Sequence, residues 1–236
     1  ANLPKVTEFW TELGQNDILF GKYKQLQARA DFADLSPARR RIVDNAVRDF
    51  RLGGAELPEN KKERFGAIQE EHAAVGTRFS ENVLDATNDY KLLVDNEAEL
   101  AGLPDDVKAA ARAAAELAGK QGYEFSLHFP SYYPILQFAD NRALRETIYR
   151  ANATKASDQG EVFSKKEDWD NTQNIVTLLR LRNEEAQLLG YANFAEVSLV
   201  SKMATSPAQV IAFLEDLAQR ARPFAEKDLA ELKQFA

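Results

Sequence analysis

The hydrophobic positions of this chain follow a helical period over most of its length. In residues 3–14, for example, Val6, Phe9, Trp10 and Leu13 lie three and four positions apart, as on one face of an α-helix. Serine followed by proline precedes two such stretches and glycine ends several of them, which are common start and stop signals of helices. The predicted helices are 3–14, one around Phe20 to Ala30, one from Pro37 to Gly53, one from Pro58 to beyond Val83, 105–120, 136–154, one from Asp170 or Asn171 to Gly190, 192–200, and one from Pro207 onwards.

The longest apolar stripe lies on the helix that begins at Pro58. Its members are spaced three and four residues apart, which is typical of a helix packed along a neighbouring helix. They are Phe65, Ile68, His72, Val75, Phe79 and Val83. Because His72 continues this stripe, we expect its ring to be at least half buried between helices rather than to bind a metal ion.

The period changes from helical to alternating in two short segments. The apolar residues Tyr90, Leu92 and Val94 alternate, and those of residues 123–129 alternate more cleanly, with aromatic enrichment. We predict that 90–94 and 123–129 pair as an antiparallel ribbon, with the helix 105–120 between them. Pro130 and Pro134 are expected to end the second strand. The predicted fold class is therefore mainly α, a multi-helix assembly with a small antiparallel β ribbon.

Composition and charge exclude several classes of protein. Apolar residues make up 44% and charged residues 28% of the 236 residues, which argues against disorder and against a chain embedded in a membrane. The chain has no cysteine, so disulfides, thiolate zinc sites, Fe–S clusters and thiol nucleophiles are excluded. The net charge of −7 disfavours nucleic-acid binding, although Arg39, Arg40, Arg41 and Arg48 lie close together.

Candidate catalytic residues are scarce. The two histidines, His72 and His128, do not begin a His-Glu-x-x-His motif, and His128 is expected on the exposed face of its strand. The adjacent carboxylates Glu70-Glu71, Asp105-Asp106 and Glu184-Glu185 point in different directions on a helix and are interpreted as solvated. No glycine-rich phosphate loop or nucleophile-elbow motif occurs. We therefore assign no catalytic and no metal-binding residue, and the substrate-binding residues stay unknown.

The ends of the sequence suggest a piece of a longer protein. Met203 is the only methionine, and the final helix keeps its apolar period to Ala236 without a stop signal. Pro223 is expected to kink or split that helix. Because Phe224, Leu232 and Phe235 would be left exposed, self-association through residues 207–236 is predicted.

Eight short motifs occur in an order that resembles a known family. They are Asn82-Val83-Leu84-Asp85-Ala86-Thr87, Glu97-Ala98-Glu99-Leu100-Ala101-Gly102-Leu103-Pro104, Pro130-Ser131-Tyr132-Tyr133-Pro134, Leu144-Arg145-Glu146 with Tyr149-Arg150, Ala156-Ser157-Asp158-Gln159-Gly160, Gln187-Leu188-Leu189-Gly190-Tyr191, Ser201-Lys202-Met203-Ala204 and Arg220-Ala221-Arg222-Pro223. This succession resembles the thimet-oligopeptidase-like zinc metallopeptidases over nearly the whole chain, least before about residue 35.

The resemblance implies a cytoplasmic endopeptidase that cuts short peptides in a deep channel between two helical lobes. In that family two histidines of His-Glu-x-x-His and a downstream glutamate hold zinc, which activates a water molecule. That motif is absent here, so residues 1–236 are expected to form a single helical region, an internal and non-catalytic part of the channel wall that binds no zinc itself. The alternative is a stand-alone helical module for protein interactions; a helical nucleic-acid accessory protein is disfavoured by the charge.

Overall fold

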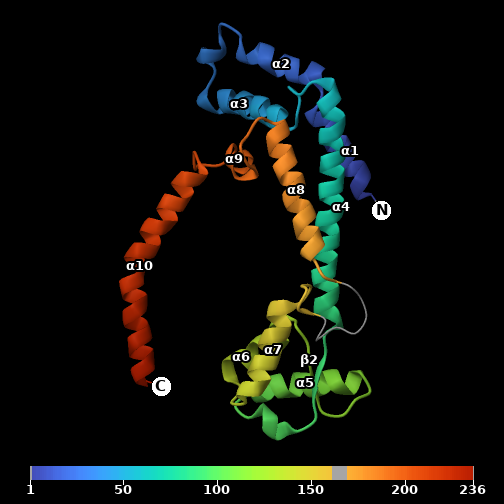
Figure 1. Cartoon of the computed structure of the whole chain (residues 1–236), viewed down its shortest axis with the longest axis vertical. Helices are drawn as coiled ribbons and strands as arrows, with labels where there is room; N and C mark the ends of the chain where they lie inside the picture. Colours follow the sequence, from blue (N-terminus) through green and yellow to red (C-terminus); the bar gives the residue numbers. More distant parts are fainter. Residues whose placement is uncertain (1, 161–168, 236) are drawn as a thin grey trace. The chain divides into compact units, whose positions relative to one another are not determined.

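The chain is mainly helical throughout residues 2–160 and 169–235, which the computed structural model describes, and these residues contain one two-stranded sheet (Figure 1). The predicted fold class is confirmed. The helices are α1 (Leu3–Gly14), α2 (Asp17–Gln27), α3 (Pro37–Leu52), α4 (Glu59–Asp89), α5 (Asp105–Leu117), α6 (Phe129–Phe138), α7 (Arg142–Thr154), α8 (Thr172–Leu188), α9 (Phe194–Leu199) and α10 (Pro207–Phe235); the strands are β1 (Leu92–Val94) and β2 (Tyr123–Phe125), and short 3₁₀ turns lie at Phe32–Asp34 and Glu97–Leu100.

These elements form two compact units. The described residues of Ala1–His72 and Leu179–Ala236 make up the first unit, and those of Ala73–Leu178 make up the second. The boundary therefore runs through α4 and α8, so each unit contains part of both helices. The polar loop predicted for residues 156–169 lies largely outside the described residues.

The predicted ribbon is present in the second unit, but it is shorter than predicted. β1 and β2 pair antiparallel, with Leu92 opposite Phe125 and Val94 opposite Tyr123. Gly122 leads into β2 with a positive φ of 99°, and a Cβ at this position would lie 2.7 Å from the carbonyl oxygen of Val94. Only glycine fits so close an approach of the two backbones.

The alternation of residues 123–129 does not continue as a strand beyond Phe125. Leu127 is still buried, but the chain turns at Ser126, whose backbone N–H donates to the Ser131 hydroxyl. α6 begins at Phe129, and Pro130 occupies its first turn, where a missing N–H does no harm. The prediction of a strand to residue 129 was therefore wrong because the start of a helix takes over these positions.

A second correction concerns the helix predicted for residues 136–154. The structure divides it into the end of α6 and the whole of α7, which contact each other and are joined by a short turn. Asn141 caps α7, because its side-chain oxygen accepts hydrogen bonds from the backbone N–H groups of Ala143 and Leu144. An asparagine N-cap starts a new helix here, and the apolar period alone did not reveal it.

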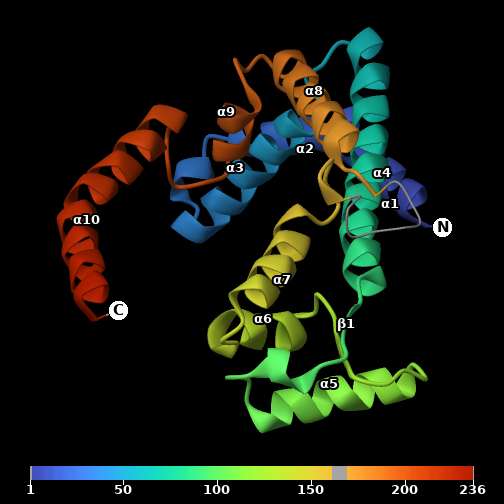
Figure 2. The ribbon, with the colours of Figure 1, turned by 60° about the horizontal axis from the view of Figure 1, so that its bottom comes forward.

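The core of the second unit packs both strands against α5, α6 and α7 (Figure 2). Its centre is fully buried, with Phe125 only 1% exposed and Ile135 and Ile148 at 0%. The buried members are Tyr90, Val94, Leu100, Leu103, Ala111, Tyr123, Phe125, Leu127, Ile135, Ala139, Leu144, Ile148 and Ala151.

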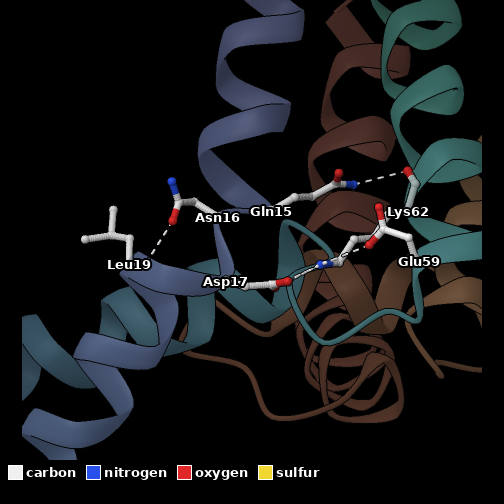
Figure 3. A network of polar contacts seen from close by, with 6 residues as sticks. All are labelled: Gln15, Asn16, Asp17, Leu19, Glu59 and Lys62. Atoms are coloured by element: carbon white, nitrogen blue, oxygen red, sulfur yellow. Dashed lines mark hydrogen bonds and ion pairs between the residues drawn. The ribbon is translucent and has the colours of Figure 1, made fainter.

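The first unit contains a smaller core between α2 and α3, formed by Phe20, Val47, Phe50 and Ala55. Polar contacts connect the junction of α1 and α2 to the start of α4 (Figure 3). The Lys62 ammonium, largely buried, lies 2.8 Å from an Asp17 carboxylate oxygen, and the Gln15 amide donates to the Lys62 backbone carbonyl.

α10 has no buried residue along its described length. It is a single element from Pro207 to Phe235, so Pro223 does not split it. Phe224, Leu232 and Phe235 are 71%, 64% and 93% exposed, as expected from the sequence. Whether this surface causes self-association of residues 207–236 stays a prediction.

Candidate functional site

Charged and polar side chains gather where α4 and α8 lie side by side in both views (Figure 1, Figure 2). We call the group within the first unit the α4–α8 polar seam. Its members from α4 are Arg64, Gln69, Glu71 and His72, and its members from α8 are Arg180, Arg182, Glu184 and Glu185.

Two arginines connect the helices through carboxylates. The Arg64 guanidinium donates two hydrogen bonds of 2.6 Å to the two carboxylate oxygens of Glu184. Arg180 donates to a Glu71 carboxylate oxygen at 3.0 Å and lies 3.8 Å from Glu184. A two-pronged arginine–carboxylate pair fixes orientation as well as distance. The Arg64 guanidinium accordingly holds the pKa of the Glu184 carboxyl below its usual value.

His72 lies in this seam and is mostly shielded from solvent, as the apolar stripe predicted. Its Nε2 accepts a hydrogen bond of 3.3 Å from Nε of Arg182. Burial lowers the pKa of His72, and the charge of Arg182 lowers it further. The same Arg182 guanidinium lies over the Phe194 ring at 5.3 Å, so it connects α4, α8 and α9.

Glu185 occupies the more buried part of the seam. Burial raises the pKa of its carboxyl, and the nearby Gln69 amide and Arg182 charge offset this only in part. The Gln69 amide nitrogen is itself buried beside this carboxyl. Burial of a carboxyl carries a free-energy cost that a neighbouring hydrogen-bond donor reduces.

The prediction that the adjacent carboxylates are solvated is wrong for Glu71, Glu184 and Glu185. Glu71 and Glu184 are ion-paired across the seam and Glu185 is partly buried. Asp105 and Asp106 do lie in the exposed first turn of α5, where carboxylates favour the helix dipole.

A second polar cluster lies in the other unit, where α4 passes the start of α8. Asn171 is only 2% exposed, and its amide donates to the Phe79 carbonyl oxygen at 3.1 Å. Its side-chain oxygen accepts from Asn82 at 3.0 Å and from Asn174 at 2.7 Å. Asp170 or Asn171 was predicted to cap the helix that follows. The Asp170 carboxylate accepts a hydrogen bond from the Thr172 N–H, and the Asn171 side chain connects two helices. No local sequence pattern predicts this contact of Asn171 between helices.

The two histidines belong to different compact units. His72 lies in α4 of the first unit, while His128 is an exposed residue at the start of α6 in the second unit. The predicted surface position of His128 is confirmed, but its predicted place in a strand is wrong. Among residues 2–160 and 169–235, no three His, Cys, Asp or Glu side chains form a group that could hold a metal ion.

The seam can hold α4 and α8 in register. Its Glu71 and Glu184 carboxylates are paired with arginines, and Nε2 of His72 accepts a hydrogen bond from Arg182. Within the described part of the chain, no helix is long and apolar enough to span a membrane.

We expect His72 to make stability depend on pH. Because its pKa in the folded chain lies below the reference value of 6.5, the unfolded chain binds the proton more readily. The His72 contribution is thus fully present above pH 6.5 and is lost as the pH falls below it towards the folded pKa. Urea unfolding of His72→Gln should show a shallower loss of stability over that window.

The matched control is His128→Gln, which removes an exposed imidazole from the other unit and leaves the contacts of His72 in place. An unchanged profile for His72→Gln would contradict the assignment of His72 to the seam.

Sequence comparisons give two family matches. Residues 2–62 match the Neurolysin/Thimet oligopeptidase N-terminal domain, and residues 135–236 match Peptidase family M3. The chain is 47% identical over 234 residues to Oligopeptidase A of Salmonella typhimurium, and 47% identical over 234 residues to that of Escherichia coli, covering 99% of this chain and 34% of each relative. It is 37% identical over 243 residues to a probable cytosolic oligopeptidase A of Arabidopsis thaliana, covering 99% of this chain and 33% of the relative.

These matches run through both compact units and both polar clusters, since they cover 99% of the chain. The chain spans about a third of the length of the curated relatives it matches.

Proposed function

We propose that this chain belongs to the thimet-oligopeptidase-like peptidases of family M3 and is part of a zinc-dependent oligopeptidase that hydrolyses short peptides. The observation that carries the proposal is the identity of 47% over 234 residues with a bacterial oligopeptidase A. A cytoplasmic location accompanies the proposal, since one of the similar proteins is named as cytosolic.

Residues 1–236 supply non-catalytic helical scaffold in this proposal. The described residues do not fit a zinc ion, because no three suitable side chains gather and the two histidines belong to different units. A catalytic zinc needs about three protein ligands around an open position. We therefore place the zinc ligands of the enzyme in the part of the longer protein outside these residues.

The scaffold role is supported by what the polar clusters do. Arg64, Glu184 and Arg182 hold α4 and α8 together in the first unit, and Asn171 does so in the second. A charge-assisted pair such as Arg64–Glu184 keeps neighbouring helices in one register. A channel wall needs such rigidity because a peptide must be positioned to within a fraction of an ångström of the reacting groups.

Two measurements on the purified chain test the proposal. After dialysis it should retain no stoichiometric zinc, and it should not cleave a quenched fluorescent peptide. A longer protein that includes this chain and a His-Glu-x-x-His segment should bind zinc and cleave the peptide until a chelator is added. Stoichiometric zinc and chelator-sensitive cleavage by residues 1–236 alone would overturn the scaffold assignment.

The alternative function is a stand-alone helical module for protein interactions, and the exposed apolar face of α10 favours it. The reading frame after Ala236 separates the two functions. Continuation into a His-Glu-x-x-His motif supports the peptidase, whereas an immediate stop codon supports the interaction module. Sedimentation of the purified chain would show in either case whether residues 207–236 mediate self-association.

A further inference from the structure

The outer edge of β1 borders a hollow in the second unit. This hollow has a volume of about 330 Å³. It is lined by β1 together with the residues that follow it, and by the first turns of α7. The lining residues are Leu92, Leu93, Val94, Asp95, Asn96, Glu99, Asn141, Ala143, Leu144 and Thr147. We call this hollow the β1–α7 groove.

The groove faces the edge of the strand rather than one of its faces. Successive residues of a strand point to opposite faces, yet all three residues of β1 line the groove. No residue of β2 lines it, and β2 pairs with the other edge of β1. The groove therefore lies along the edge of β1 that has no strand partner in the two-stranded sheet of the described residues.

That edge carries backbone groups suited to a further strand. In an antiparallel pair, alternate residues direct their N–H and C=O groups towards the partner and away from it. At least one residue of Leu92–Val94 must then direct both groups into the groove. An extended peptide adds to such an edge through main-chain hydrogen bonds, and a helix on the other side of the groove contacts its side chains.

The charge of the groove indicates which peptide it would accept. Asp95 and Glu99 contribute carboxylates to the lining, and both are exposed. No lysine, arginine or histidine is among the lining residues. Leu93, 38% exposed, adds an apolar contact. Complementarity of charge favours a peptide that carries lysine or arginine.

We propose that the β1–α7 groove binds an extended, basic peptide segment as a third strand beside β1. The choice of a peptide as the ligand rests on the proposed function, because a peptidase that acts on short peptides needs surfaces that hold them in extended form. At about 3.3 Å per residue, the three residues of β1 would pair with a segment of about three residues. The groove then acts as a peptide-binding surface of the second unit.

The test uses the 236-residue chain and a fluorescent pentapeptide of alternating valine and lysine. Fluorescence anisotropy should show saturable binding. Two N-methylated forms of the peptide are compared, one methylated at its odd-numbered residues and one at its even-numbered residues. Only one of the two forms should lose binding, since only every second N–H faces the strand. This comparison leaves the protein fold untouched. The proposal would be overturned if both N-methylated peptides lost binding equally, or if no saturable binding occurred up to about 1 mM peptide.

Two pairs of variants locate the site. Ala143→Phe fills the groove from the exposed side of α7 and should weaken binding roughly tenfold or more, whereas Ala153→Phe, exposed on the same helix, should not. Glu99→Gln should weaken binding of the lysine peptide about threefold to fivefold, and Glu116→Gln, exposed on α5, should not. Binding that Ala143→Phe leaves unchanged would contradict the site.

The same variants also distinguish other occupants of the β1–α7 groove. If the chain alone forms a dimer that Ala143→Phe dissociates, the groove holds a second copy and the peptide proposal is wrong. The peptide assay does not depend on zinc or on cleavage. A failure to bind therefore leaves the peptidase proposal standing, and an inactive longer protein would leave the groove measurement unaffected.

Discussion

Replacing Phe125 with alanine should lower the free energy of unfolding by about 3–5 kcal/mol. The Phe125 side chain is 1% exposed and lies in the main core of the second unit, where β2 packs against α5. Its removal loses the transfer free energy of the ring and leaves a cavity that the close-packed neighbours cannot fill completely. Urea unfolding followed by circular dichroism measures this loss.

Phe129→Ala is the matched control because it removes the same side chain four residues later. Phe129 is 61% exposed and stacks on Tyr133 with ring centroids 4.6 Å apart. Its loss should cost no more than about 1 kcal/mol, the typical contribution of an exposed aromatic pair. Similar costs for the two variants would mean that both rings are buried, as a strand running over the whole of 123–129 would require.

A large loss of stability is also expected for Asn171→Ala, about 2–4 kcal/mol. Asn171, only 2% exposed, is the central residue of a partly buried hydrogen-bond group that includes the Phe79 carbonyl and the Asn82 and Asn174 amides. Alanine would leave two partly buried amide donors without their acceptor and the Phe79 carbonyl without its donor. Hydrogen exchange of the α4 and α8 amides, together with urea unfolding, measures the effect.

Asn174→Ala provides the comparison for this second cluster. It removes one donor and leaves Asn171 bonded to Phe79 and Asn82, so the cost should stay near 1 kcal/mol. If Asn174→Ala were as damaging as Asn171→Ala, the central position assigned to Asn171 would be incorrect.

Local signals in the sequence determined most of the helices. The apolar period and the glycine stop placed α1 at Leu3–Gly14 as predicted, and Ser36 caps α3 through its hydroxyl, which accepts from the Arg39 N–H. The alternation around Leu92 and Phe125 also predicted the pairing of the ribbon correctly. These signals succeed because they depend on residues within one or two helical turns, or on one face of a strand.

The candidate site was less predictable because its contacts join distant positions. Arg64 and Glu184 are separated by 120 positions, and Asn171 and Phe79 by 92. Nothing in the neighbourhood of Glu184 or Glu185 distinguishes a paired or partly buried carboxylate from a solvated one. His72 was the exception, since the apolar stripe on its own helix already indicated burial.

The sequence by itself therefore determined the fold class, the burial of His72 and the similarity to the oligopeptidases. The tertiary structure decided where β2 ends, which carboxylates are paired and what Asn171 connects. The physical reason is that helical period, caps and strand alternation record how each segment divides between core and solvent. A buried polar group, in contrast, needs a hydrogen-bond partner because its burial without one costs free energy. Which residue becomes the partner depends on which helices pack together, and the local sequence does not contain that information.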